Sequence, residues 1–267
     1  MSNLQELIED FDFITEVAYD LSQQFDGVQT DDRKKKVSTY YLAKVVPECM
    51  SLLRVLPGSR FTDTEELFDF PSFCSISRSV IEAANLHWYY CIESIDAEVS
   101  NFRFYLYDFH DNKSTMQISK FIDGEEEGLD LLQEKCDDLK DKIIQSDKFK
   151  SLLPEVQRQI LKGRKCSDMN QTEIPESRGL DLNTFNGIYK ILSTNTHSTP
   201  SAISAIVHSR IHGKELHEAF AGLVLSYVAS FVADMVRTIG EIWCLEFAKD
   251  ESEEIIAVYS EGLSEST

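Results

Sequence analysis

The segment "AFAGLVLSYVASFVADMV" at 219–236 is the feature that most constrains how this chain folds. It holds 15 consecutive uncharged residues before Asp234 interrupts it, and Gly222, Ser226 and Ser230 dilute its apolar character. A helix that crosses a bilayer needs about 20 apolar residues, so this run is short for that purpose. In water, a helix that is apolar on nearly all sides is covered by other elements. We therefore expect the chain to fold around a buried central helix.

The rest of the chain shows the same preference for helix. Apolar residues at helical spacing predict helices over 3–26, from about 32 to 56, over about 73–94 and over about 96–122. Strand-like alternation is absent, and 11 Gly and 6 Pro are too few for a sandwich or barrel of many short strands. The sequence predicts an all-α fold, a helical bundle of about 8–10 helices without a significant β-sheet.

The domain organisation follows from where the helical pattern weakens. Residues 162–182 show no apolar periodicity and predict a linker or a loop. We expect 1–249 to be a single helical domain in which 123–180 is an insertion-like segment. Residues 250–267 are acidic, and we expect them to form a flexible tail.

Charge and cysteine usage narrow the compartment and the partners. The chain has 26 basic and 46 acidic side chains, a formal net charge of −20, which disfavours binding to phosphate backbones and suits a basic protein partner. The densest basic run, "DDRKKK" at 31–36, is interpreted as a solvated helix start. The N-terminus lacks the basic and apolar regions of a signal peptide, and six scattered cysteines without a Cys-x-x-Cys pair fit reduced thiols. We expect a cytoplasmic protein with no membrane contact, no metal site and no cofactor.

Polar residues line one face of the helix predicted over 73–94. Arg78 and Glu82 are four residues apart, and Asn85 and Tyr89 continue the same face. The other sides of this helix are apolar, so we expect it to be buried. A buried Arg or Glu needs charged or hydrogen-bonding partners, and Arg78 and Glu82 can satisfy each other only in part.

A second polar row occurs in the helical pattern "YKILSTNTH" at 189–197, where Tyr189, Ser193 and His197 follow at four-residue spacing. These side chains suit the missing partners, so we expect His197 to face the helix at 73–94. Two interpretations stay open: a core polar network that sets helix register, or a site that lines a cleft. In the second, the catalytic candidates are Arg78, Glu82, Ser193 and His197, and the binding candidates are Tyr189, Asn85 and Tyr89.

These two rows resemble a family pattern. An Arg-x-x-x-Glu helix followed by a Tyr-x-x-x-Ser-x-x-x-His helix, here Arg78, Glu82, Tyr189, Ser193 and His197, resembles bacterial all-helical families catalogued as domains of unknown function. The resemblance covers 70–240. Those families occur in mobile or defence-related contexts and are similar in outline to the HEPN superfamily of nucleotide-binding and RNA-cleaving domains. The resemblance implies a helical fold more firmly than an activity.

HEPN ribonucleases carry Arg-x(4–6)-His with a polar residue directly after the Arg. In their metal-free chemistry a His acts as general acid or base while the Arg stabilises the phosphorane. Arg210 and His217, with six residues between them, are therefore weaker catalytic candidates here. Ile211 stands where a polar residue is expected, and Gly213 is expected to break the helix between the two.

Two functions from different classes follow. The first is a protein that acts through a protein partner, as an immunity, antitoxin, defence-associated or regulatory component with an acidic surface. The alternative is a HEPN-like metal-independent ribonuclease or nucleotide-binding domain, which would form a homodimer and would contact nucleic acid. The net acidity and the poor match at Arg210 and His217 favour the first. Whether the protein is an enzyme is left open by the sequence.

Overall fold

A computed structural model of the chain describes residues 4–62, 68–122, 126–197, 199–212, 215–245 and 251–264. Side chains are described for all of these except 126–127, 209–212, 215–216, 251 and 264. Over this part of the chain the structure is all-α, with no strand, which confirms the predicted fold class.

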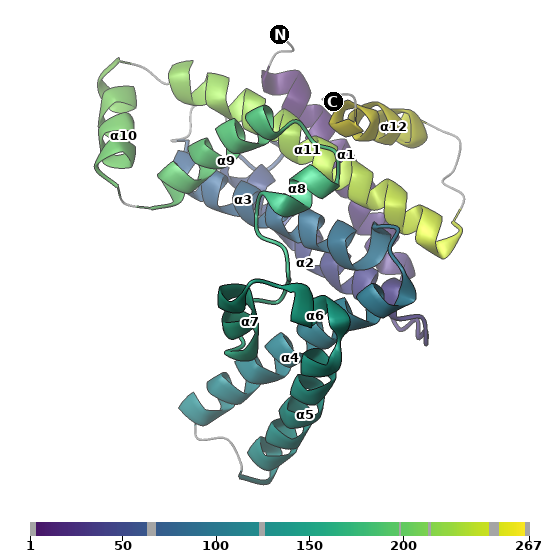
Figure 1. Cartoon of the computed structure of the whole chain (residues 1–267). Helices are drawn as coiled ribbons and strands as arrows, with labels where there is room; N and C mark the ends of the chain where they lie inside the picture. The colour runs from purple at the N-terminus through teal and green to yellow at the C-terminus, as the bar shows by residue number, and fades with distance from the viewer. Residues whose placement is uncertain are drawn as a thin grey trace. The chain divides into compact units, whose positions relative to one another are not determined.

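Twelve α-helices are present in the described ranges, more than the 8–10 expected because α6 and α8 are single turns of five residues. The helices in Figure 1 are α1 (Leu4–Gln24), α2 (Arg33–Val55), α3 (Phe70–His87), α4 (Ala97–Phe121), α5 (Glu126–Gln145), α6 (Asp147–Ser151), α7 (Pro154–Leu161), α8 (Glu173–Ser177), α9 (Leu182–Thr196), α10 (Pro200–His212), α11 (Glu215–Trp243) and α12 (Glu251–Ser264). A π-helical turn, Trp88–Ile92, extends α3.

The chain divides into two compact units. Residues 1–92 and 171–267 form the main unit, and residues 93–170 form the hairpin unit. The predicted insertion at 123–180 therefore begins and ends earlier than expected. The reason is that α4 pairs with α5 inside the hairpin unit, so α4 does not belong to the bundle that precedes it.

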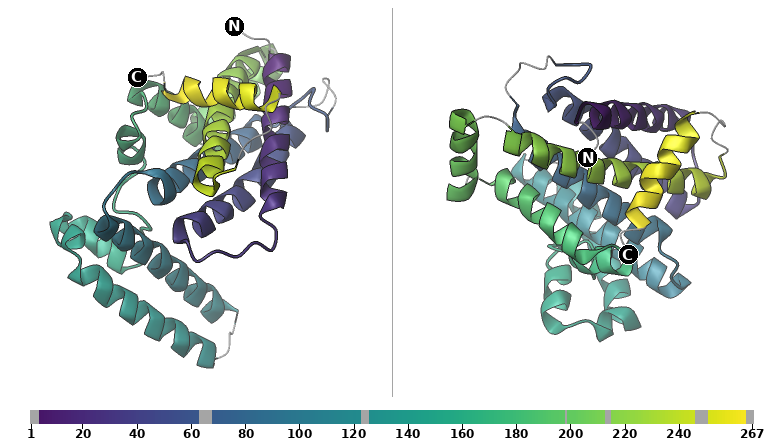
Figure 2. Two further views of the ribbon diagram at one scale, coloured as in Figure 1. Left: turned by 90° about the vertical axis from the view of Figure 1, so that its right-hand side faces the viewer. Right: turned by 90° about the horizontal axis from the view of Figure 1, so that it is seen from above.

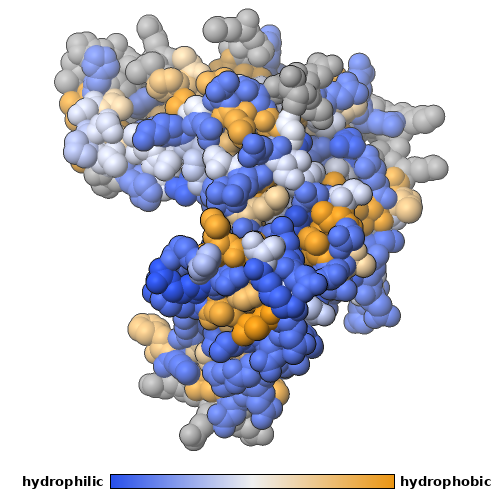
Figure 3. Space-filling view, in the orientation of Figure 1, coloured by the Kyte–Doolittle hydropathy of each residue, from blue (hydrophilic) through white to orange (hydrophobic). Residues whose placement is uncertain are grey.

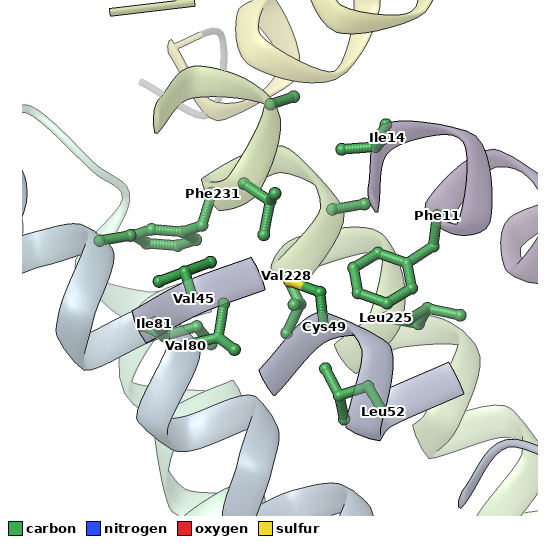
Figure 4. Packing of buried hydrophobic residues seen from close by; sticks show 14 of the residues in the cluster. Phe11, Ile14, Val45, Cys49, Leu52, Val80, Ile81, Leu225, Val228 and Phe231 are labelled. Carbon is green, nitrogen blue, oxygen red and sulfur yellow. The ribbon is translucent and has the colours of Figure 1, made fainter. Parts of the chain in front are cut away.

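The core of the main unit surrounds α11. Figure 4 shows Val228 and Phe231 of α11 packed among Phe11 of α1, Val45 of α2 and Ile81 of α3. All five side chains are buried, which confirms the prediction of a buried central helix. By length and composition alone α11 could cross a membrane, but 67% of its most apolar window is buried in the protein, and a buried core helix meets the same criteria.

The expected flexible tail is wrong for residues 251–264, which form α12. Figure 2 shows α12 crossing α11 with one end beside α1. Ile256 and Leu263 are buried, and Tyr259 donates a 2.7 Å hydrogen bond from its Oη to Asp10 Oδ2. The four-residue spacing of Ile255, Tyr259 and Leu263 already encoded this apolar stripe within an acidic segment.

Replacing Ile256 with alanine is expected to lower the free energy of unfolding by about 2 kcal/mol or more, because a buried side chain leaves a cavity between α11 and α12. Val258→Ala, on the same helix but 61% exposed, is expected to change it by less than about 0.5 kcal/mol. Urea titration monitored by circular dichroism measures both. Equal values for the two variants would contradict the docking of α12.

Aspartates start the helices that carry the predicted polar rows. Asp69 accepts from the Ser72 backbone N–H at the start of α3, and Asp181 accepts from the N–H groups of Asn183 and Thr184 at the start of α9. These bonds satisfy backbone donors that a helix leaves unpaired at its N-terminus. The two helices pack against each other, so their polar faces can meet.

The hairpin unit has a small separate core between α4, α5, α6 and α7. Its buried residues are Phe102, Leu106, Phe109, Cys136, Leu139, Ile143, Phe149 and Ile160. On α4 these residues extend only from 102 to 109, whereas the helix continues to Phe121. Figure 3 shows hydrophobic residues on the surface of this unit among hydrophilic ones.

Candidate functional site

The polar faces of α3 and α9 meet at Glu82. Its Oε1 accepts from Arg78 Nε at 2.8 Å and from Tyr189 Oη at 2.7 Å. The Arg78 guanidinium also lies over the Tyr189 ring, 4.9 Å from its centroid. Arg78 and Glu82 are half-buried, so the cluster has one side open to solvent. The structure thus brings Tyr189 to the Arg78–Glu82 pair, as the spacing had suggested.

The phenol of this cluster is held as a hydrogen-bond donor. Burial, followed by the hydrogen bond to Glu82, raises the pKa of Tyr189 to about 12. At neutral pH the Tyr189 hydroxyl therefore stays protonated and donates a hydrogen bond to the Glu82 carboxylate. This arrangement stabilises the α3–α9 contact, and it leaves the phenol unsuited to act as a base or a nucleophile.

The predicted row on α9 does not reach His197. The helix ends at Thr196, and His197 has extended backbone angles (φ −103°, ψ 145°) and an exposed side chain. The expectation that His197 faces α3 is therefore corrected, and the row stops at the half-buried Ser193. The helix could not have continued much further, since Thr199 stands before Pro200 and a residue before proline is driven out of the helical region.

The two remaining binding candidates on α3 are buried. The Tyr89 ring is fully buried and packs edge-on against Tyr90, with 4.7 Å between ring centroids. Asn85 is buried as well, and its Oδ1 accepts a 3.0 Å hydrogen bond from Arg178 Nη1. Neither side chain is placed to meet a ligand directly. Asn85 instead belongs to a polar network that sequence reasoning did not find.

The HEPN-type pair is divided between two helices. Arg210 lies on α10, and its side chain is outside the described residues. His217 lies on α11, buried and stacked on Phe70 with 4.5 Å between ring centroids. Burial lowers the pKa of His217, so its ring is a neutral part of the core. A general base must reach the proton that it abstracts, and this ring is covered.

The residues that sequence reasoning missed are Arg178 and Asp234. Arg178 follows α8, in the segment interpreted as a linker, and Gly179 (φ 79°) then turns the chain toward α9. Arg178 donates from Nη2 to Asp234 Oδ2 on α11 and lies over the Phe231 ring at 4.8 Å. Its side chain is only 5% exposed. The sequence did contain a signal for this pair, because Asp234 is a single charge in an apolar run. A buried carboxylate of this kind needs a cationic partner.

Asp234 is shared between two arginines. Its second oxygen, Oδ1, accepts from Arg237 Nη2 at 2.6 Å. Arg237 is 40% exposed and also pairs with the exposed Glu241. Both carboxylate oxygens of Asp234 are thus occupied, and the two guanidinium groups exceed the buried negative charge by one. The exposed Glu241 supplies a second negative charge, so the four side chains together are neutral, and Arg237 can meet another anion only where Glu241 is displaced.

A pocket of about 340 Å³ opens beside this network. Arg178, Asp234 and Arg237 lie at one part of its wall. The rest of the wall consists of Trp88, Ile92, Gly179, Leu180, Thr238 and Leu263. Ligand sites in proteins occupy roughly 300–1,000 Å³ and combine apolar walls with a few polar groups, so this pocket has the size and lining of a small-ligand site.

A second feature lies at the end of the hairpin unit, where four large apolar side chains are exposed. Ile118 is 62% exposed, Phe121 87%, Ile122 67% and Leu131 53%. We call these four residues the apolar tip. Ile118 and Phe121 lie in the last turn of α4, Ile122 is the cap residue that follows it, and Leu131 lies on α5.

No protein-family model, no curated protein and no solved structure matches this chain. The resemblance to HEPN-like families therefore stays a prediction from short motifs. The function has to be inferred from the geometry of the main unit and of the hairpin unit.

Proposed function

We propose that the protein acts by binding a protein partner through the apolar tip of its hairpin unit. The observation that carries this proposal is Phe121, a large aromatic ring left 87% exposed at the end of a long helix. Clustered exposed apolar side chains mark interaction surfaces, and aromatic anchors supply much of the binding energy at such surfaces. An immunity, antitoxin, defence-associated or regulatory role fits a protein of this kind.

The tip lies beyond the core that holds the hairpin unit together. From Phe109 to Phe121, α4 continues for about 18 Å at the rise of an α-helix. In that stretch Met116 is buried, whereas Ile118 and Phe121 of the last turn are exposed. Stability of the unit does not explain large apolar side chains at that end, because they bury little surface there.

The charge around the tip indicates the chemistry of the partner. α5 carries seven acidic and three basic residues along its length, and Asp130 and Glu134 are exposed within one turn of Leu131. Lys120 and Lys135 are exposed there as well, but along the whole of α5 the carboxylates exceed the cations by four. Apolar side chains beside such an acidic helix complement an amphipathic segment with basic flanks. The partner we propose is therefore a protein that presents a basic amphipathic helix.

The described residues do not form a site that would support the ribonuclease alternative. His217 is buried against Phe70, and His197 is exposed at the end of a helix, where no described contact joins it to the Arg78–Glu82 pair. Metal-independent RNA cleavage needs an accessible histidine close to an arginine. The partner-binding proposal requires no such arrangement.

The test uses a fluorescein-labelled amphipathic helix of leucine and lysine, about 18 residues or five turns long. Fluorescence anisotropy is expected to show saturable binding that weakens at least tenfold in Phe121→Ser. Ile203→Ser provides the matched control, because Ile203 is also exposed (53%) but lies on α10 of the main unit. Both variants should keep the wild-type melting temperature, since the replaced side chains are exposed.

Three outcomes would overturn the proposal. Equal binding of a matched peptide with glutamate in place of lysine would show that charge does not select the partner. An equal loss of binding in Phe121→Ser and Ile203→Ser would show that the tip is not the contact. Sedimentation that reveals a dimer lost in Phe121→Ser would mean that a second copy of the chain covers the tip.

A further inference from the structure

We propose that the pocket beside Arg178, Asp234 and Arg237 is a binding site for a small organic monocarboxylate with an apolar or aromatic body. This inference is independent of the partner-binding proposal, because all of its residues lie in the main unit. It rests on three features: a guanidinium at the wall of the pocket that can take an anion, an apolar remainder of the wall, and the size of the cavity.

Arg237 is the group that would take the carboxylate. It is 40% exposed and lines the pocket, whereas Arg178 is buried and fully engaged with Asn85 and Asp234. The outer contact of Arg237 is an exposed pair with Glu241, of a kind worth at most about 1 kcal/mol. A ligand carboxylate can replace Glu241 and bind the planar guanidinium through two parallel hydrogen bonds.

Asp234 makes this site selective for anions that carry a single charge. Its two oxygens are already taken by Arg178 and Arg237, so the three groups together carry one net positive charge. One carboxylate neutralises that charge. A dianion or a nucleotide polyphosphate would leave unpaired negative charge next to Asp234.

The rest of the wall suits an apolar body. Trp88 and Ile92 come from the π-helical turn that extends α3, and Leu180 and Leu263 add aliphatic surface from two other segments. Trp88 adds aromatic surface to this wall, which suits a ligand with a planar group. With a volume of about 340 Å³, the pocket is at the small end of the range for ligand sites, which favours a compact ligand over a nucleotide.

The experiment is isothermal titration calorimetry of the full chain with phenylacetate, indole-3-acetate and octanoate, each compared with its neutral amide. We expect at least one carboxylate to bind with 1:1 stoichiometry and at least tenfold more tightly than its amide. Arg237→Gln is expected to weaken that binding at least tenfold. Arg60→Gln is the matched control. Arg60 is 39% exposed, and it also contacts two carboxylates, those of Asp12 and Glu16, which lie on α1 away from the pocket lining.

A second variant tests the pocket without changing its charge. Ile92→Trp places a larger side chain in the wall and is expected to abolish binding while the melting temperature stays within a few degrees of wild type. Trp88 fluorescence, recorded in a Trp243→Phe background, should respond to the carboxylate that binds, because these are the two tryptophans of the chain. Absence of binding by all three carboxylates at millimolar concentration, equal affinity for acid and amide, or an equal effect of Arg237→Gln and Arg60→Gln would overturn the proposal.

Discussion

Replacing Arg178 with methionine is expected to lower the free energy of unfolding by about 3–5 kcal/mol. The substitution leaves the Asp234 carboxylate largely buried with only the partly exposed Arg237 as a partner, and it removes the donor that binds Asn85 Oδ1. A buried charge without its partner costs far more than the pair itself contributes, because neither water nor the protein then solvates it. Urea unfolding at pH 7 measures the change.

The double variant Arg178→Met/Asp234→Leu separates this effect from a loss of packing. Removing both charges is expected to restore part of the stability that Arg178→Met loses, since no buried carboxylate is left unpaired. Arg158→Met is the control: Arg158 forms an exposed pair with Glu155 on α7, and its replacement should cost less than about 1 kcal/mol. A double variant no more stable than Arg178→Met would contradict the account.

The second large effect is a loss of stability at acidic pH that depends on His87. This histidine is fully buried, and burial followed by the nearby Arg178 charge lowers its pKa from 6.5 to about 3, against the opposing effect of Asp234. Between pH 6.5 and about 3, His87 is protonated in the unfolded chain but stays neutral in the folded protein. The free energy of unfolding is therefore expected to fall, as pH drops from about 6 to 4, by about 1.4 kcal/mol per pH unit from this group alone.

His87→Gln is expected to remove that part of the slope, and its stability should converge toward that of wild type as the pH falls. His197→Gln, which changes an exposed histidine, should keep the wild-type slope. Chemical unfolding at a series of pH values measures all three proteins. A wild-type slope retained in His87→Gln would show that other groups account for the acid sensitivity.

Local interactions explain why so much of the secondary structure could be predicted. The helix predicted over 96–122 is observed at Ala97–Phe121, and the one predicted from about 32 to 56 begins after Asp32, which caps it. A cap bonds backbone groups two or three residues away, and an apolar stripe repeats within one turn. The same argument found the Arg78–Glu82 pair, which is an i, i+4 contact.

Two of the errors share one physical cause, since each depended on a distant residue, whereas the third was local. The tail was interpreted as flexible because its charge was counted, whereas its apolar stripe becomes ordered only when α11 and Asp10 are beside it. Segment 162–182 lacks periodicity along its own sequence, and its Arg178 finds its partner Asp234 only when α11 is beside it. The end of α9 moved His197 away from α3 by a change of backbone angles at a single residue.

The sequence by itself determined that this chain is helical and that 219–236 is buried, and it marked Tyr189 as a candidate partner of Arg78 and Glu82. Those conclusions follow from spacing along a helix and from the cost of exposing apolar surface. Only the tertiary structure decided that Asp234 has its counterion 56 residues earlier in the chain, at Arg178, and that a pocket opens beside them. The low-dielectric core makes that pairing obligatory, but many cations could have satisfied it, and the fold selects which one does.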